Sequence, residues 1–385
     1  MKKEEASRLE KLENLKNEGI NPYPSVALNC GSIANVREKK EGEVIIAGKI
    51  ISLRSHGKST FADLEDESAK IQLYFKLDNL GEKKYQDLSL LDAGDYIQVK
   101  GDLFSTHAGE LTVEIKEFSI LAKSLLPIPD KWYGLKDTEI RYRKRFLDLI
   151  INDNARNNLR IRSKIVSSLR SFMEKNNFIE IETPVLQPIP GGAAAKPFKT
   201  KYNILGQDMY LRIAPELYLK RLIVGGFERV YEIGKNFRNE GLSHMHNPEF
   251  TMMEFYWAYQ NYESLMDFTE KLVSNLVKEI KGKLKITYQG EEIDFKPPYK
   301  RVKFIDLIRD HCGIDLEKSS DFESLKKEVL SKNIDLNFKE ISTWPKLADE
   351  LYKKVARPKI MQPTFLIDYP SVLKPLAKAK AENSN

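Results

Sequence analysis

The stretch from residue 228 to residue 262 constrains the fold more than any other, because it joins two extended runs through a polar loop. It reads ERVYEIGKNFRNEGLSHMHNPEFTMMEFYWAYQNY. The first run, residues 229–237, mixes apolar and charged side chains and ends at an Asn-Glu-Gly turn signal. The second run, residues 249–259, is apolar at nearly every position. These patterns predict an antiparallel hairpin inside a large sheet.

A carboxylate lies within the second run, at Glu254. Because strand side chains alternate between two faces, Glu254 shares its face with Phe250, Met252 and Tyr256. Burying an unpaired charge costs on the order of several kcal/mol. We therefore expect Glu254 either to meet a cation or to be protonated.

The intervening loop carries three polar side chains, Arg238, Glu240 and His246. Such a group at one turn could contact a phosphate and a polar ring together. The plain alternative is an ordinary buried hairpin with surface charges on its loop. That alternative gives no reason for Glu254 or for the clustering of the loop charges.

The sequence FRNEG followed by HNPEFTMME resembles motif 2 of the class II aminoacyl-tRNA synthetases, and more narrowly the lysyl version of that motif. The resemblance implies that L-lysine reacts with ATP, that pyrophosphate leaves, and that the lysyl group passes from the adenylate to tRNA(Lys). This chemistry needs no covalent protein nucleophile. Catalysis consists of placing the lysine carboxylate in line with the α-phosphate and neutralising the developing charge.

The same resemblance implies roles for the residues around the loop in binding ATP. Arg238 would be the catalytic residue, bridging the lysine carboxylate and the phosphate. Glu240 would bind the adenine amino group, Phe250 would stack on the adenine ring, and His246 would contact the outer phosphates.

The resemblance implies lysine-binding roles for Gly192, Glu216, Arg238, Glu254 and Tyr256. Gly192 lies in a small-residue loop where backbone can approach a ligand closely. With Glu216 it would hold the α-ammonium, although an acid at a helix start also has an ordinary role there. Glu254 and Tyr256 would bind the side-chain ammonium, and an acid left without its cation penalises a shorter or neutral substrate.

The composition is that of a globular chain of two or three domains, with 385 residues, 41% hydrophobic and 31% charged. No apolar run approaches the length that spans a membrane, and the first residues match no signal or transit peptide. We therefore expect a cytoplasmic protein. The net charge of +6 permits a polyanionic partner without requiring one.

The two cysteines, Cys30 and Cys312, have no metal-ligand spacing, so we expect both to be reduced and structural. Residues 1–41 begin with a short amphipathic helix that carries Leu9, Leu12 and Leu15 among lysines and glutamates. That helix could be a flap that contacts RNA, or it could pack on the next domain.

Residues 42–122 alternate short strands with turns and predict a small five-stranded barrel of the OB type, whose open face commonly binds single-stranded nucleic acid. The period of two predicts that Ile51 and Leu53 point inward and that Phe61 points outward. An outward aromatic beside an arginine and an amide suits stacking of an unpaired base. The alternative is an aromatic at the barrel end that a neighbouring loop covers.

The segment GKSTFADL followed by IQ resembles the anticodon-binding barrel of the lysyl enzymes. The resemblance implies anticodon contacts at Arg54, Phe61 and Gln72, and a weaker one at Glu110. Residues 123–150 resemble the connector of that family.

Residues 151–385 resemble part of the class II catalytic domain. A helix followed by a strand ending at Pro184 resembles motif 1, which implies a homodimer through residues 158–184; the apolar face of that helix could equally belong to the core. The fold class expected is α+β, with the OB-type barrel followed by a class II antiparallel sheet flanked by helices and incomplete at its C-terminal end.

The resemblance also implies features that residues 1–385 do not contain: acidic metal-binding strands, the stretch that completes the lysine pocket, and motif 3. We therefore expect a fragment that does not activate an amino acid by itself, which ATP–pyrophosphate exchange with lysine tests. Mg²⁺ is expected with ATP, with its ligands outside this chain. Nothing explains Lys374, where the family usually has serine.

Two other classes stay open at this point. A synthetase of the aspartyl or asparaginyl type shares the architecture, but its pocket should offer a cation where Glu254 stands. A non-catalytic paralogue that binds tRNA or a protein partner would keep the barrel and lack the active site. A lysine ligase that acts on a protein normally lacks the barrel.

Overall fold

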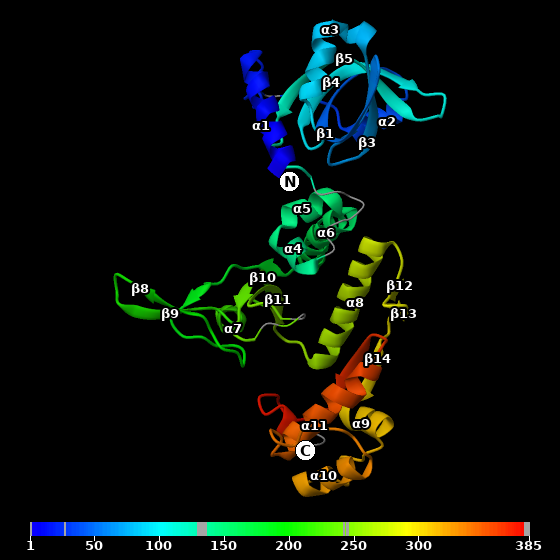
Figure 1. Cartoon of the computed structure of the whole chain (residues 1–385). Helices are drawn as coiled ribbons and strands as arrows, with labels where there is room; N and C mark the ends of the chain where they lie inside the picture. The colour runs from blue at the N-terminus through cyan, green and yellow to red at the C-terminus, as the bar shows by residue number, and fades with distance from the viewer. Residues whose placement is uncertain (1, 27, 129–136, 242, 244–245, 381–385) are drawn as a thin grey trace. The chain divides into compact units, whose positions relative to one another are not determined.

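The structure is a computed structural model that describes residues 2–26, 28–128, 137–241, 243 and 246–380. Part of the expected linker and part of the expected motif 2 loop therefore lie outside the described residues. The chain divides into two compact units, Met1–Asn157 and Asn158–Asn385. Figure 1 shows the elements of each unit.

A closed five-stranded barrel forms the centre of the first unit (Figure 1). Its strands adjoin in the order β1 (Gly42–His56), β2 (Ser59–Glu65), β3 (Lys70–Lys76), β5 (Leu111–Ala122) and β4 (Tyr96–Ser105). Neighbours are antiparallel, except that β3 and β5 are parallel. Alternate apolar side chains fill the interior, so the prediction of a five-stranded OB-type barrel is confirmed.

The inward positions of β1 differ from the prediction at one place. The register between β1 and β2 shifts between Ile50 and Ser52. Ile50 is fully buried while Ile51 is only half-buried, so the prediction that Ile51 points inward is wrong. A bulge adds one residue to a strand and exchanges the faces beyond it, which returns Leu53 to a position opposite Ala62.

Helix α1 (Lys2–Asn17) packs on the barrel. Leu15 is fully buried in the barrel core. Arg8 is 5% exposed and donates hydrogen bonds to the carbonyls of Ala93 and Ser124, at 3.1 and 3.2 Å. Of the two interpretations of this helix, the structure favours packing on the next domain.

Four shorter helices complete the first unit. They are α2 (Ile33–Lys39), α3 (Leu77–Asp87), α4 (Thr138–Arg143) and α5 (Arg145–Ile151), and η1 (Leu88–Leu90) continues from α3. Long helix α6 (Asp153–Lys175) begins in the first unit and continues into the second.

The predicted hairpin is present in the second unit. Strands β10 (Arg229–Phe237) and β11 (Glu249–Trp257) pair antiparallel over their whole lengths. Strand β6 (Ile179–Glu180) adds to β10 in parallel, so the described sheet has three strands and is smaller than expected. A second three-stranded sheet has the order β7 (Leu186–Gln187), β9 (Gln207–Leu211), β8 (Lys199–Tyr202).

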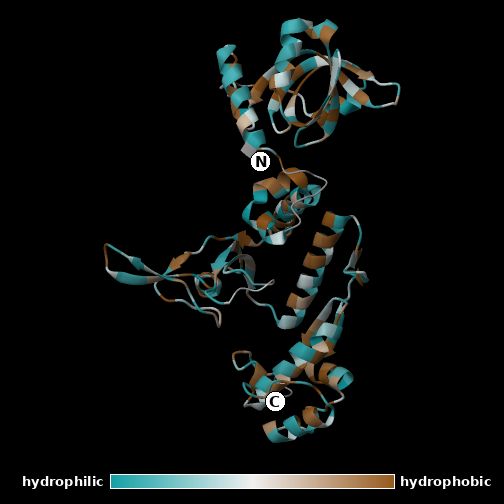
Figure 2. Ribbon diagram, in the orientation of Figure 1, coloured by the Kyte–Doolittle hydropathy of each residue, from teal (hydrophilic) through white to brown (hydrophobic). Residues whose placement is uncertain are grey.

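One face of the hairpin packs on helices. Tyr231 on β10 and Phe255 on β11 lie in a core with Met173 of α6 and Phe268 of α8 (Tyr262–Lys281). The ring centroids of Phe255 and Phe268 are 5.5 Å apart. Figure 2 shows the amphipathic character of α8 as apolar and polar bands along the helix. Because strand faces alternate, the other face of the hairpin points away from this core.

The remaining elements form a separate hydrophobic core around Phe304 and Leu347. They are β12 (Lys285–Tyr288), β13 (Glu291–Asp294), β14 (Lys300–Lys303), α9 (Phe304–Cys312), α10 (Phe322–Ser331), α11 (Trp344–Leu351) and β15 (Thr364–Ile367). Helix α7 (Glu216–Val224) follows β9 and precedes β10 in the chain.

Both cysteines are free, and burial raises the pKa of the Cys312 thiol to about 11, as suits an unreactive structural residue. Among the described helices, none combines the length and the apolar character needed to cross a bilayer.

Candidate active site

The face of the hairpin that points away from the aromatic core carries two carboxylates among apolar and polar side chains. Four cross-strand pairs form it, and they are Val230–Tyr256, Glu232–Glu254, Gly234–Met252 and Asn236–Phe250. Directly opposed side chains on one face of an antiparallel pair have β-carbons about 4.5–5.5 Å apart. Two carboxylates, Glu232 and Glu254, are therefore neighbours in the middle of this face.

Glu254 is half-buried, and its carboxylate accepts a hydrogen bond from the Tyr256 hydroxyl at 3.2 Å. Burial raises the pKa of Glu254, and the nearby charges of Glu216 and Glu232 add to the rise; the Tyr256 bond and Arg238 oppose it. Within the described residues no lysine or arginine forms an ion pair with Glu254. The acid is thus available to an external cation.

The start of α7 borders this acid. Glu216 is the first residue of the helix, and its carboxylate pairs with Lys220 one turn later, at 2.5 Å. The Lys220 ammonium lies 5.8 Å from the centroid of the Tyr256 ring. Pairs of this kind on a helix surface contribute only about 0.3–0.5 kcal/mol, so a substrate ammonium could replace Lys220 as the partner of Glu216.

Gly192 lies directly against Glu216. Its φ of +86° belongs to the left-handed region, and a β-carbon there would lie 2.9 Å from the β-carbon of Glu216 and 3.2 Å from that of Ala214. Only glycine fits this conformation and this approach without displacement. The structure therefore brings the expected residues Gly192 and Glu216 together.

Arg238 and Phe250 also meet. The guanidinium carbon of Arg238 lies 5.1 Å from the centroid of the Phe250 ring, a cation–π contact. The Arg238 Nε is buried and has no hydrogen-bond partner among the described residues. A buried donor of this kind is costly unless a ligand completes it.

The other two expected loop residues lie at the surface. Glu240 is exposed, and its backbone N–H donates to the Arg238 carbonyl at 3.0 Å. His246 is exposed as well, with its Nδ1 2.7 Å from the Ser243 hydroxyl. The structure therefore does not bring these two side chains into the half-buried group around Glu254.

Sequence analysis missed a buried ion pair beneath this face. Arg212, 2% exposed, follows β9 and pairs with Glu232, 4% exposed, on β10. Thr183 links them, since its hydroxyl donates to Glu232 at 2.6 Å and accepts from Arg212 at 3.0 Å. The sequence held a signal for this pair. Glu232 is a charged residue within a predicted strand, between Tyr231 and Ile233. Arg212 likewise stands between the apolar residues Leu211 and Ile213.

On the barrel, three of the four expected anticodon residues lie on one outward surface. Arg54 stands opposite Phe61 across β1 and β2, and Gln72 lies on the next strand. The Oε1 atom of the Gln72 side chain accepts a hydrogen bond from the Thr112 hydroxyl at 3.0 Å. Glu110 is exposed on the connection between β4 and β5, two residues before Thr112.

Tyr74 extends this surface and was not predicted. Its ring stacks on Phe61 with centroids 4.8 Å apart and an interplanar angle of 25°. The centroid of the Phe104 ring lies 6.2 Å from that of Tyr74. Arg54 is held by Asp63 at 3.0 Å. The signal was the period of two, because Tyr74 follows Gln72 on the same face of β3.

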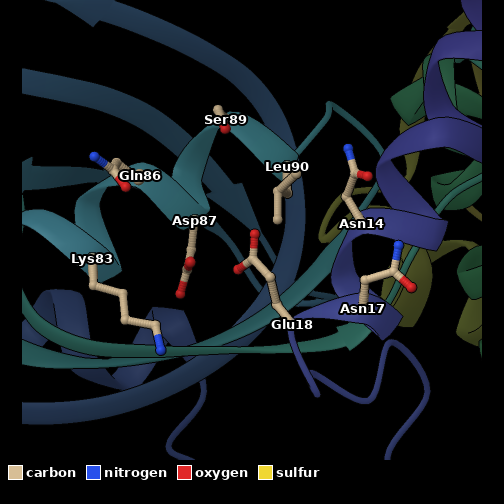
Figure 3. A pocket seen from close by; sticks show the side chains of 8 residues that line it. All are labelled: Asn14, Asn17, Glu18, Lys83, Gln86, Asp87, Ser89 and Leu90. Carbon is tan, nitrogen blue, oxygen red and sulfur yellow. The ribbon is translucent and has the colours of Figure 1, made fainter.

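A polar cavity of about 580 Å³ lies elsewhere in the first unit (Figure 3). Figure 3 shows side chains after and along α1 facing those of α3 and η1 across it, and the lining consists of Asn14, Asn17, Glu18, Lys83, Gln86, Asp87, Ser89 and Leu90. Most of these residues are exposed, so the cavity is an open surface hollow. None of the expected site residues lines it.

Metal binding finds no support in the part of the chain that the structure describes. No three histidine, cysteine, aspartate or glutamate side chains gather there in a way that could hold an ion. Glu216, Glu232 and Glu254 therefore do not form such a group.

Both units of the chain match known protein families. Residues 137–385 match the family described as tRNA synthetases class II (D, K and N), and residues 44–121 match the OB-fold nucleic acid binding domain. The lysine–tRNA ligase of Pelotomaculum thermopropionicum is 46% identical over 380 residues, which are 98% of this chain and 75% of that protein. That of Moorella thermoacetica is 44% identical over 382 residues, 98% of this chain and 78% of the relative.

The lysine–tRNA ligase of Aquifex aeolicus is 50% identical over 342 residues, covering 88% of this chain and 57% of that protein. The family match covers well over half of the chain, and the identities to these relatives extend through both the barrel and the hairpin. The chain therefore belongs to the class II tRNA synthetases, in the group of lysyl-tRNA synthetases.

Proposed function

We propose that the protein joins L-lysine to tRNA(Lys) in two steps, with ATP as the co-substrate. In the first step a lysine carboxylate oxygen bonds to the α-phosphorus of ATP and the bond to pyrophosphate breaks. In the second, a terminal ribose hydroxyl of the tRNA attacks the carbonyl of the adenylate and AMP leaves. The observation that carries the proposal is Glu254, a half-buried acid without a basic partner among the described residues, on a face that Arg238 borders.

Glu254 and Tyr256 would hold the lysine side-chain ammonium. The Tyr256 hydroxyl orients the carboxylate from the same strand face, at 3.2 Å. A substrate that is too short or neutral would leave this acid without its cation, and such a loss of pairing discriminates strongly between substrates. At the other end of the substrate, Glu216 and the Gly192 backbone, which lie in contact, would bind the α-ammonium.

Arg238 would be the catalytic residue, because its guanidinium can contact the lysine carboxylate and the α-phosphate together. Its buried Nε, which has no hydrogen-bond partner among the described residues, supports this role. Phe250, already in contact with the guanidinium, would stack on adenine. Glu240 and His246 would contact the adenine amino group and the outer phosphates from the exposed loop.

Residues 42–122 would form the anticodon-binding barrel and residues 151–385 the catalytic domain, joined by residues 123–150 and preceded by residues 1–41. The stacked pair of Phe61 and Tyr74 supports base binding on the barrel. Arg54, Gln72 and Glu110 would supply polar contacts to the anticodon.

We also propose a homodimer through residues 158–184. Leu159 of α6 and Ile179 of β6 are 51% and 48% exposed in the single chain, and a second copy would cover them. Mg²⁺ would accompany ATP. The described residues contain no group of three side chains that could hold a metal ion. We propose a cytoplasmic location, where tRNA is charged.

Amino-acid-dependent ATP–pyrophosphate exchange by the full-length enzyme tests the proposal, with L-lysine, L-aspartate and L-asparagine compared on the same preparation. Exchange with lysine alone is the expected result. Exchange with aspartate or asparagine would overturn the lysine assignment. Binding of tRNA without exchange on any amino acid would instead support a non-catalytic tRNA-binding protein.

A further inference from the structure

The buried ion pair of Arg212 and Glu232 has no part in the function proposed so far. Arg212 donates to the Lys235 carbonyl at 2.8 Å and to the Thr183 carbonyl at 3.2 Å, and it pairs with Glu232. The backbone N–H of Thr183 donates to Glu232 at 3.2 Å. Both charged groups are thus almost fully enclosed and held by several bonds.

The backbone is shaped around this arginine. A β-carbon on Gly234 would lie 2.1 Å from an Nη atom of Arg212 and 3.1 Å from a carboxylate oxygen of Glu232. Any side chain at Gly234 would displace the guanidinium. The strand therefore carries a residue without a side chain where the arginine passes, between Glu232 and Asn236.

Glu232 lies directly opposite Glu254 in the hairpin. The negative charge of Glu232 is one of the causes that raise the pKa of Glu254. Besides Glu232, the charged and titratable groups that face Glu254 are Glu216, Arg238 and Tyr256. Lys220 does not neutralise Glu254, because its ammonium pairs with Glu216.

We propose that Arg212 is a positioning residue for lysine selection: by pairing with Glu232 it leaves the negative charge of Glu254 to the substrate ammonium. This inference rests on the proposed function. Arg212 itself touches no substrate. Without it, Glu232 would compete for the ammonium or share a proton with Glu254, and lysine would bind less well.

Exchange kinetics on Arg212→Met in the full-length enzyme test the inference. The KM for lysine should rise about tenfold or more while the KM for ATP changes by less than about threefold, as expected when one charge contact is lost at one substrate. The rise should be largest at low pH and shrink as the pH rises, because Glu254 would then lose the shared proton. Equal changes in both KM values, or a lysine KM that stays at its original value, would overturn the inference.

Two further variants separate positioning from folding. The double variant Arg212→Met with Glu232→Gln removes both charges, so it should restore the lysine KM to within about threefold of the parent protein. Arg212→Lys keeps the charge and loses the forked geometry, so it should give an intermediate lysine KM. If Arg212→Met does not fold, these two variants decide: an unrestored double variant or an unchanged Arg212→Lys contradicts the inference.

Lys123→Met is the matched control. Lys123 is fully buried in the barrel unit, 2.8 Å from the equally buried Asp95, so its loss also breaks an internal ion pair. We expect a lower melting temperature and an unchanged lysine KM. If the parent protein shows no lysine-dependent exchange, the proposed function fails; if it does and Arg212→Met keeps its KM, only the inference about Arg212 fails.

Discussion

The Tyr256 hydroxyl donates a hydrogen bond to the Glu254 carboxylate at 3.2 Å from a position two residues further along the same strand. Burial raises the pKa of Tyr256 above its usual range, and the neighbouring Glu254 raises it further, so the phenol stays protonated and remains a donor. The pair presents one acid, already oriented, to a cation that the described chain does not supply.

Replacing Glu254 by glutamine in the full-length enzyme should raise the KM for lysine by about 100-fold or more, with little effect on the KM for ATP, because a buried charged hydrogen bond contributes about 3 kcal/mol. Exchange assays with each substrate varied in turn measure this. Equal rises in both values would count against a lysine-binding role for Glu254.

The same substitution should not destabilise the protein at neutral pH. Burial raises the folded-state pKa of Glu254, so the folded state binds the proton more tightly than the unfolded state. The stability that this provides is present at acidic pH and is lost as the pH rises through the folded pKa. We expect Glu254→Gln to melt at or above the parent temperature at pH 7, and urea unfolding from pH 4 to pH 8 checks the sign.

Tyr256→Phe removes one hydroxyl and leaves the ring in place. The loss of a hydrogen bond to a charged group, about 1.5–3 kcal/mol, predicts a rise of about 10- to 150-fold in the lysine KM. The ATP KM should not change. Thermal unfolding is the companion measurement, since a large drop in melting temperature would show that the hydroxyl serves the fold instead.

Phe61→Ala should weaken tRNA binding without altering lysine-dependent exchange, because the ring stacks on Tyr74 at the barrel surface. Stacking of one base on an aromatic side chain contributes about 1–3 kcal/mol, which is about 5- to 150-fold in affinity. Tyr96→Ala is a suitable control, as this exposed aromatic lies on β4 beside Lys49. Equal losses in the two variants would argue against a specific base contact at Phe61.

Asp92→Asn should destabilise the barrel unit at neutral pH and matter less in acid. Burial alone would raise the pKa of Asp92, but hydrogen bonds from Lys11 and Lys123, at 2.7 and 2.5 Å, lower it overall. The stability from this carboxylate is present above its unfolded pKa and is lost as the pH falls through the lower folded pKa. The gap between parent and variant in urea midpoint should therefore narrow between pH 7 and pH 3.

The hairpin could be predicted from sequence because its signals are local. The turn at residues 239–241 and the alternation around Glu254 depend on neighbours along the chain, and the register in the structure follows them. The outward position of Phe61 was predictable for the same reason. The approach of Gly192 to Glu216 agrees with the small-residue loop, although its geometry depends on the fold.

The features that sequence analysis missed depend on contacts between distant segments. The sequence shows Glu232 as a charged residue in a strand. Its partner Arg212 comes from the segment after β9, and Thr183 comes from a third segment, so their contact cannot be read from neighbours along the chain. The bulge at Ile51 follows from the closure of the barrel, which a period of two within one strand does not reveal. The stacking of Tyr74 likewise needs the pairing of β2 with β3.

The two faces of the β10–β11 hairpin divide its tasks, with Phe255 and Tyr231 in the aromatic core and Glu254 and Glu232 on the polar side. A saturation library across β11 should therefore separate into two alternating classes. Changes at the odd-numbered positions of β11 would deplete soluble protein, whereas changes at its even-numbered positions would reduce protein yield less and alter which amino acid is accepted. On β10 the even-numbered positions Val230, Glu232 and Asn236 are buried, so laboratory evolution toward a new amino acid has its accessible positions on every second residue of β11.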